Sequence, residues 1–485
     1  MPPGGGSGRE IEERAESDNL RGLAKRGMAW AAVGQGGTVG LHYAIMLVLA
    51  WRLAPTEFGL VGLATIFVFT LNSVAELGLG AAIVQRRDLT PGHVAAVFWL
   101  SLAAGIGLAG GLWAGAGPIA ELMREPRLVS VLRPLALMVP VHALLVVPRA
   151  LLQRSLRFKR LAVTEIGAEV VLGVVTIGLA YRGCGLWSLV TGLFARHAAR
   201  ALLLWCLQPW RPTLRISAAE CRAVLGFGGF VMGSMLATQV FANIDYFVVG
   251  RYLGAAALAH YTLAFQLAIV PVQRIGEILS RVAFPSLARI QTDVPRVRRA
   301  FAQLLQVPAA LVASGAILLA VLAPSLLAKL YGPSWLPAAR PLQLLALAAP
   351  FYVLDCSQVV FRAMGRPALD LGLEAVRVLI FGLVAAVALG SGTTGVAASI
   401  LAAATVTGSV KLFAARRLTG ERSRRTVLPL VYAVGTLAAG AGLLANSLVV
   451  TSAAAGLIVS IAAWVGFVRS PRARVPVAGL AGLDG

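Results

Sequence analysis

Long runs of apolar residues, each long enough to cross a bilayer, fill most of this 485-residue chain. A transmembrane helix needs about 20 predominantly apolar residues. Fourteen stretches meet that requirement, and an even number returns the chain to the side on which it started. The predicted spans are residues 28–51, 60–84, 93–117, 132–152, 161–181, 185–207, 223–249, 258–283, 301–324, 341–361, 368–390, 395–416, 427–448 and 450–468. The sequence therefore predicts an all-α polytopic membrane protein with about 14 transmembrane helices.

The distribution of basic residues supports this topology. The chain has 43 Lys and Arg against 21 Asp and Glu, and in a soluble protein the net charge of +22 would indicate nucleic-acid binding. Here 58% of the residues are hydrophobic and 13% are charged, and cytoplasmic loops of polytopic proteins collect Lys and Arg. With the N-terminus inside, the inner segments hold 31 basic residues and the outer loops hold 8. We expect a lipid bilayer and no nucleic acid as partner, with both termini cytoplasmic.

The two ends of the chain differ from the spans. Residues 1–20 are Gly-rich and then charged, a composition that cannot bury itself and predicts a disordered cytoplasmic tail. The first apolar run, 28–51, is too long for a signal-peptide core and is interpreted as a retained span. Residues 469–485 are predicted to form a second cytoplasmic tail.

An internal repeat with a spacing near 200 to 210 residues divides the spans into two sets. The clearest match is the pattern R-P-L-x-L at 133–137 and again at 340–344, and Glu76 falls opposite Glu277. Six spans per copy mean that both copies enter the membrane from the same side, related by an axis along the membrane normal. Two such six-helix lobes would enclose a central cleft, which is typical of transporters.

The predicted domain boundaries follow from this repeat. The N-lobe takes residues 21–210 and the C-lobe takes residues 211–417. Two further helices occupy 418–468.

Several function classes lack their sequence signals. No G-x-x-x-x-G-K-[ST] run is present, so nucleotide hydrolysis is not indicated. The four cysteines form no C-x-x-C pair and the five histidines are scattered, so we expect no metal centre and no cofactor. The outer loops are short, so a catalytic domain outside the membrane is not expected and the chain is predicted not to be an enzyme.

Four segments resemble Wzx-type polysaccharide flippases of the multidrug/oligosaccharidyl-lipid/polysaccharide (MOP) exporter superfamily. They are WRLAPTEFGLVGLA (51–64), ELGLGAAIVQR (76–86), IDYFVVGRYLGAAALAHYTLAF (244–265) and RVAFPSLARIQTDVPRVRRAF (281–301). The likeness runs from about residue 20 to 417. The resemblance implies a bacterial cytoplasmic-membrane protein that moves undecaprenyl-pyrophosphate-linked oligosaccharide by alternating access for surface polysaccharide biosynthesis. It also implies a polysaccharide polymerase and glycosyltransferases as partners.

Two other functions stay open at this stage. An ion-coupled exporter of small cationic drugs would share the two-lobe fold, but its cleft should be acid-rich and nearly free of Arg. A membrane polymerase or glycosyltransferase would need paired acids in an outer loop, where the sequence offers only Glu57, Glu121 and Glu125.

Charged residues inside the spans are the candidate ligands of an anionic head group, since each costs at least about 2.5 to 3.5 kcal/mol at a helix centre unless it is paired or hydrated. Glu165 and Glu169 lie one turn apart on one span, and Arg196 and Arg200 lie one turn apart on the next. Their distances from the predicted helix ends favour a structural Glu169–Arg200 pair. That pairing would leave Arg196 facing the cleft.

The span 258–283 offers a second cationic stretch. Arg274, Glu277 and Arg281 lie along one face of this helix. The planar guanidinium suits phosphate because it donates to two oxygens at once, and Arg274 is our first choice for the pyrophosphate ligand. An intrahelical pair of Glu277 with either arginine is the alternative. Arg196, or Arg149 at the inner rim, would then take its place.

Carboxylates inside the spans could bind Na⁺ or a proton and so couple transport to an ion gradient. The candidates are Glu76, Glu277, Asp245, Asp370 and Glu374. Two alternatives compete, because Arg377 is three residues after Glu374 and Asp245 could pair with Arg251.

Overall fold

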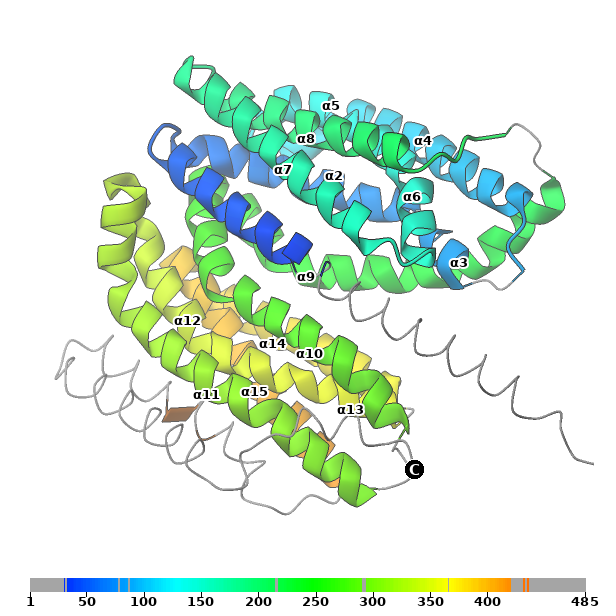
Figure 1. The fold of residues 1–485 in the computed structure, drawn as a ribbon. Helices are drawn as coiled ribbons and strands as arrows, with labels where there is room; N and C mark the ends of the chain where they lie inside the picture. The colour runs from blue at the N-terminus through cyan, green and yellow to red at the C-terminus, as the bar shows by residue number, and fades with distance from the viewer. Residues whose placement is uncertain are drawn as a thin grey trace, which may run out of the picture. The chain divides into compact units, whose positions relative to one another are not determined.

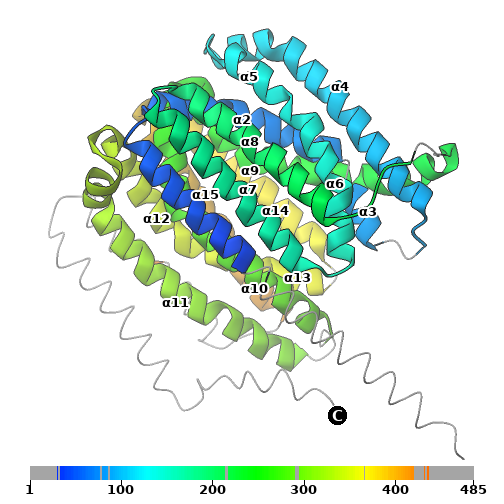
Figure 2. The same ribbon diagram turned by 45° about the horizontal axis from the view of Figure 1, so that its top comes forward.

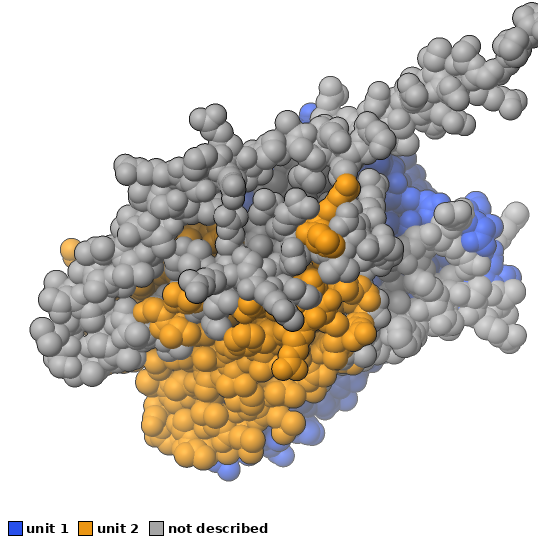
Figure 3. Space-filling model, turned by 90° about the horizontal axis from the view of Figure 1, so that it is seen from below, with its two compact units in different colours: residues 1–256 blue, residues 257–485 orange. Residues whose placement is uncertain are grey.

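The computed structural model describes residues 33–419, apart from 77–78, 86–87, 214–216, 290–293 and 365, together with residues 30, 431, 434 and 435. Within these residues the regular structure is helical (Figure 1). The chain divides into two compact units, residues 1–256 and 257–485, which Figure 3 distinguishes by colour. This division falls inside a helix, Ala218–Ala268, that bends at Gly254, where φ is 86°. The lobe boundary predicted near residue 210 stays a prediction.

The helices of unit 1 follow the predicted spans. After the span Val33–Ala50 they are α2 (Pro55–Glu76), α3 (Leu79–Gln85), α4 (Pro91–Met123), α5 (Leu128–Ala136), α6 (Met138–Arg154), α7 (Phe158–Tyr181), α8 (Leu186–Leu207) and the part of α9 (Ala218–Ala268) that ends at residue 256. The predicted span 132–152 is in fact two helices, with Leu137 between them. Pro140 explains the break, since it has no N–H for the carbonyl of Ala136.

Local signals in the sequence begin two of these helices. Thr90 caps α4: its hydroxyl accepts from the His93 backbone N–H at 3.2 Å. Ser217 and Glu220 form a capping box before α9, with the Ser217 N–H donating to the Glu220 carboxylate at 3.0 Å. Hydrogen bonds from the Ser217 backbone and hydroxyl hold the pKa of Glu220 below its ordinary value.

Unit 2 contains the remaining described helices. They are α10 (Val270–Arg289), α11 (Val294–Leu326), α12 (Ala339–Leu354), α13 (Gln358–Ala363), α14 (Pro367–Ala388) and α15 (Thr393–Leu418), with short turns at Leu327–Tyr331, Pro333–Ala338, Asp355–Ser357 and Leu389–Ser391. The predicted span 341–361 is interrupted by the 3₁₀ turn Asp355–Ser357. α15 packs against α12 and α14, so residues of three helices can meet there.

The described residues contain nine helical segments long and apolar enough to cross a membrane, or ten if the bent pair Asn243–Ala268 and Val270–Glu277 is one span. The polytopic all-α fold is thereby confirmed. The last two predicted spans, 427–448 and 450–468, lie outside the described residues except at 431, 434 and 435. The total of fourteen and the internal repeat therefore stay predictions, as do the tails 1–20 and 469–485, which also lie outside the described residues.

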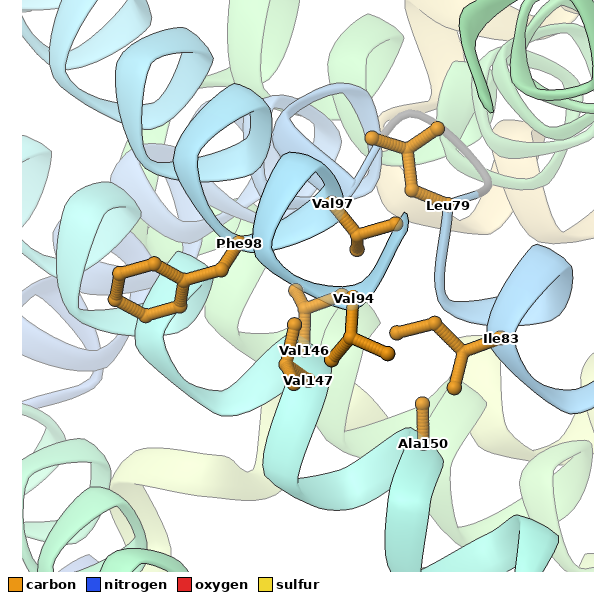
Figure 4. Close-up of a cluster of buried hydrophobic side chains, with 8 residues drawn as sticks. All are labelled: Leu79, Ile83, Val94, Val97, Phe98, Val146, Val147 and Ala150. Atoms are coloured by element: carbon orange, nitrogen blue, oxygen red, sulfur yellow. The ribbon is translucent and has the colours of Figure 1, made fainter. Parts of the chain in front are cut away.

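Two features of unit 1 hold its charged helices in place. α7 and α8 lie side by side in both ribbon views (Figures 1 and 2). α6 is fixed on its other side by an apolar cluster with α3 and α4, shown in Figure 4. Its members are Leu79, Ile83, Val94, Val97, Phe98, Val146, Val147 and Ala150. Because lipid tails are as apolar as these side chains, the cluster holds α6 by close van der Waals packing and not by removal of apolar surface from water.

Candidate functional site

The charged residues of α7 and α8 form a ladder of ion pairs. Arg200 bonds Glu165 at 2.7 Å, and Arg196 approaches Glu169 to 3.4 Å. His42, on the first span, also contacts Glu169 at 2.9 Å from its Nδ1. The Glu169 carboxylate is 3% exposed and needs such partners.

The predicted Glu169–Arg200 pair is therefore wrong, and Arg196 is not left unpaired. α7 begins at Phe158, whereas the predicted span began at 161, so the estimated depth of Glu169 was nearly one turn too shallow. Measured from the observed ends of the antiparallel helices, Glu169 and Arg196 lie at equal depth.

A narrow pocket lies beside this ladder within unit 1. It is partly open, and it is lined by Glu76, His142, Leu145, Val146, Arg149 and Arg200. Three residues that the sequence predicted separately, Glu76, Arg149 and Arg200, are thus brought together. In the described part of the chain, neither Glu76 nor Arg149 has an ion-pair partner.

His142 is a pocket residue that the sequence analysis missed. It lies on α6, and its Nδ1 is buried without a hydrogen-bond partner. Its ring centroid is 6.4 Å from that of His197, whose Nδ1 contacts the Leu193 carbonyl at 3.0 Å. The available signal was the spacing of seven between His142 and Arg149, which places both on one helix face.

Pro148 helps to set the position of α6. Because proline lacks an N–H, the Leu144 carbonyl one turn earlier loses its helical donor. The Trp205 indole of α8 donates to that carbonyl instead, at 3.1 Å. At the end of α6, Arg154 donates to the Ile83 carbonyl of α3 at 2.6 Å. The helix that carries His142 and Arg149 is thus tied to two neighbours.

In unit 2, the predicted first-choice ligand Arg274 bonds Glu277 at 3.0 Å within α10. Both side chains are nearly half exposed, at 45% and 47%. The intrahelical pair that the sequence left as an alternative is the one observed. The side chain of Arg281 lies outside the described residues.

A buried charge cluster joins the turn after α12 to α14 and α15. It consists of Asp355, Asp370, Glu374, Arg377 and Lys411, which we call the unit 2 cluster. The Lys411 ammonium is 0% exposed and lies 3.2 Å from the Asp370 carboxylate and 3.4 Å from that of Asp355, and it also bonds Glu374.

Arg377 provides the second cation of this cluster. It bonds Asp355, lies 3.5 Å from Glu374 and donates from Nε to the Thr407 hydroxyl at 3.1 Å. The alternative that Arg377 pairs with Glu374 is confirmed, and Asp355 is a further partner. With three carboxylates and two cations, the cluster has one more negative than positive charge when all are ionised.

Two members of the cluster were missed in the sequence. Lys411 was assigned to the inner loops, but it is buried in α15. Asp355 lay inside a predicted span and was passed over. The signal was present, since acids and bases recur in consecutive apolar runs.

Asp245, a third predicted carboxylate, is 3% exposed on α9, and Arg251 lies over the Tyr252 ring at 5.5 Å. Among the described residues no group of three or more His, Cys, Asp and Glu is arranged to hold a metal ion.

Membrane-length helices that bury a few charged residues in an apolar core define a polytopic membrane protein. The chain belongs to the polysaccharide biosynthesis protein family, whose family model matches residues 48–340. The resemblance seen in the sequence is thereby confirmed.

Individual relatives carry related names. The succinoglycan biosynthesis transport protein ExoT of Rhizobium meliloti (strain 1021) is 31% identical over 67% of this chain. The lipopolysaccharide biosynthesis protein WzxC of Escherichia coli (strain K12) is 26% identical over 72% of it. The chain spans 65% and 69% of the length of these two relatives.

Solved structures show the same fold at low identity. The lipid II flippase MurJ in an inward closed conformation aligns with a TM-score of 0.68 at 13% identity, covering 90% of this chain and 97% of that one. An inward-facing multidrug resistance MATE family transporter of the MOP superfamily gives 0.62 at 16% identity, covering 80% and 98%. The MOP-type fold is thus established independently of the sequence resemblance.

Proposed function

We propose that this protein is a flippase that moves a polyprenyl-diphosphate-linked oligosaccharide across the bacterial cytoplasmic membrane by alternating access, with both termini cytoplasmic. The observation that carries the proposal is the pocket in unit 1, where Arg149 and Arg200 lie together among membrane-length helices. The relatives named for succinoglycan transport and lipopolysaccharide biosynthesis support the same substrate class.

The two arginines of the pocket provide donors for an anionic head group. A diphosphate diester carries two negative charges and several acceptor oxygens, which match the forked donors of two guanidinium groups. The helix ladder neutralises Arg196 and much of Arg200, so among the described residues Arg149 is the pocket cation without an ion pair, and Glu76 is the unpaired acid of the same pocket. A small cationic drug would meet two arginines here, so the drug-exporter alternative is disfavoured. A transport role also accounts for the pocket without any catalytic step.

Arg149 and Arg200 are therefore the proposed head-group ligands. Arg274 can bind the head group only when its ion pair with Glu277 is broken. For coupling, we assign proton exchange to the unit 2 cluster, where Asp370 and Glu374 share Lys411; Na⁺ coupling is not assigned to these residues of the described chain, which are not arranged to hold a metal ion. In this proposal glycosyltransferases assemble the glycan before transport, and a polysaccharide polymerase uses it after transport.

The test measures surface polysaccharide in a strain that lacks its own flippase. Arg149→Gln should abolish the polysaccharide and leave lipid-linked oligosaccharide on the inner face, while Arg149→Lys should retain part of the activity. Arg182→Gln is the matched control, because Arg182 is exposed at the end of α7. For Arg200 the variant is the Glu165→Gln/Arg200→Gln double, which leaves no buried carboxylate unpaired. Normal polysaccharide from Arg149→Gln and from the double variant, at normal membrane levels, would contradict the proposal.

A further inference from the structure

His142 lines the unit 1 pocket, and one of its ring nitrogens lacks a hydrogen-bond partner within the described residues. Its Nδ1 is buried and no atom of the described chain bonds it. Buried polar atoms are nearly always hydrogen-bonded, and an exception inside a pocket points to a partner that arrives from outside. His142 shares the pocket wall with Arg149 and Arg200, so this partner would sit among three nitrogen groups.

The charges around His142 come from four helices. Glu76 of α2 and Arg149 of α6 line the same pocket without ion pairs. α8 contributes Arg196, His197 and Arg200, and α7 contributes the acids that pair with its two arginines, namely Glu169 and Glu165. α3 carries no charged residue, and α4 and α5 contribute none to the pocket lining.

We propose that His142 is the third ligand of the diphosphate group and takes up a proton when this anion enters the pocket. The inference rests on the proposed function. In the empty pocket a charged imidazole would add a further cation beside two arginines. A bound diphosphate reverses the sign of the local field, and a protonated imidazole donates from both of its nitrogens. Nδ1 is buried in this structure, so it gains a phosphate oxygen as acceptor only when the pocket widens to admit the head group.

With His142 as a ligand, binding of the head group is coupled to the uptake of a proton by the protein. Each head group that enters the pocket would bring up to one proton into unit 1, and release of the head group would return it. Arginine alone cannot do this, because it stays charged at every accessible pH.

The test is isothermal titration calorimetry of the purified full-length protein with farnesyl-diphospho-N-acetylglucosamine. This diphosphate diester has no group that titrates near neutral pH, so any proton exchanged belongs to the protein. Titrations at pH 7.5 in two buffers of different ionisation enthalpy give the number of protons taken up. We expect uptake by the wild type, and no uptake by His142→Asn, which keeps a donor near Nδ1 and binds roughly tenfold more weakly.

His93→Asn is the control, since His93 lies at the exposed start of α4, and it should keep the wild-type proton uptake. If His142→Asn does not purify as a folded protein, His142→Gln replaces it. Binding by the wild type without proton uptake, or unchanged uptake in the His142 variant, overturns this inference and leaves the flippase proposal standing. A wild type that does not bind the probe overturns both.

Discussion

Lys411 should be indispensable for the folding of unit 2, and the structure gives the size of the effect. At an effective dielectric constant near 20, an ammonium about 3 Å from a carboxylate gains roughly 5 kcal/mol of gross Coulomb energy, most of it offset by desolvation. Lys411→Met leaves three carboxylates of low exposure around Arg377 alone. Removing one partner of a buried pair typically costs about 3–5 kcal/mol, and we expect a loss of that order. The assay is the apparent unfolding midpoint in detergent, together with the yield of folded protein from membranes.

The rescue variant separates charge from packing. Asp370→Asn combined with Lys411→Met restores the original excess of one carboxylate, so it should recover much of the lost midpoint, since a lone buried charge is the costly species. Lys329→Met is the matched control, because Lys329 is exposed, and it should unfold like the wild type. If Lys411→Met also unfolds at the wild-type midpoint, or if the double variant is no better than the single one, the cluster does not hold these helices together.

Three further outcomes follow from the contacts in unit 1. Exchanging the charges of the Glu165–Arg200 pair should restore the membrane yield that either single reversal lowers, as measured by quantitative immunoblot; equal yields for all three variants would contradict the pairing. Trp205→Phe removes the donor to the Leu144 carbonyl and should lower the unfolding free energy by about 1 kcal/mol, read from denaturant titration, whereas an unchanged free energy would show that another donor replaces the indole. The depressed pKa of Glu220 means that its stabilisation of the first turn of α9 is complete above the unfolded pKa near 4.3 and is lost as pH falls through the lower folded value. Hydrogen exchange of that turn should therefore rise, after correction for intrinsic rates, only below about pH 4 in the wild type and be pH-independent in Glu220→Gln.

The sequence predicts which segments are helices far better than how those helices are aligned. The predicted spans up to residue 416 fall on helical segments, because long apolar runs leave a membrane segment few other structures. Their bounds are less accurate: the predicted span 60–84 covers both α2 and α3, and the span 258–283 crosses the bend between α9 and α10. The interruptions at Leu137 and at Asp355–Ser357 were not predicted, since their apolar character continues across each break.

The candidate site shows why alignment is the harder problem. One turn of α-helix is about 5.4 Å, and an error of three residues at the start of α7 was enough to assign Glu169 to the wrong arginine. Membership of the pocket could not be predicted either, because Glu76, His142 and Arg200 come from three helices whose rotation is set by packing. The sequence analysis also counted Lys411 among the basic residues of the inner loops, whereas the structure buries it fully.

The ion pairs decide which charges remain for ligands in each unit. In unit 1 every acid of the α7–α8 ladder has a basic partner, and the adjoining pocket adds one arginine, Arg149, and one acid, Glu76, so the formal charges there balance. In unit 2 each cation is shared by at least two carboxylates, so the surplus of the cluster is negative. Anion recognition in unit 1 therefore depends on which arginine lacks an ion pair and not on a net positive charge. Arg149 has no ion-pair partner in the described part of the chain, whereas Arg274 is neutralised by Glu277 and nearly half exposed, so Arg274 is the weaker ligand candidate. The negative surplus of the unit 2 cluster favours the binding of a proton.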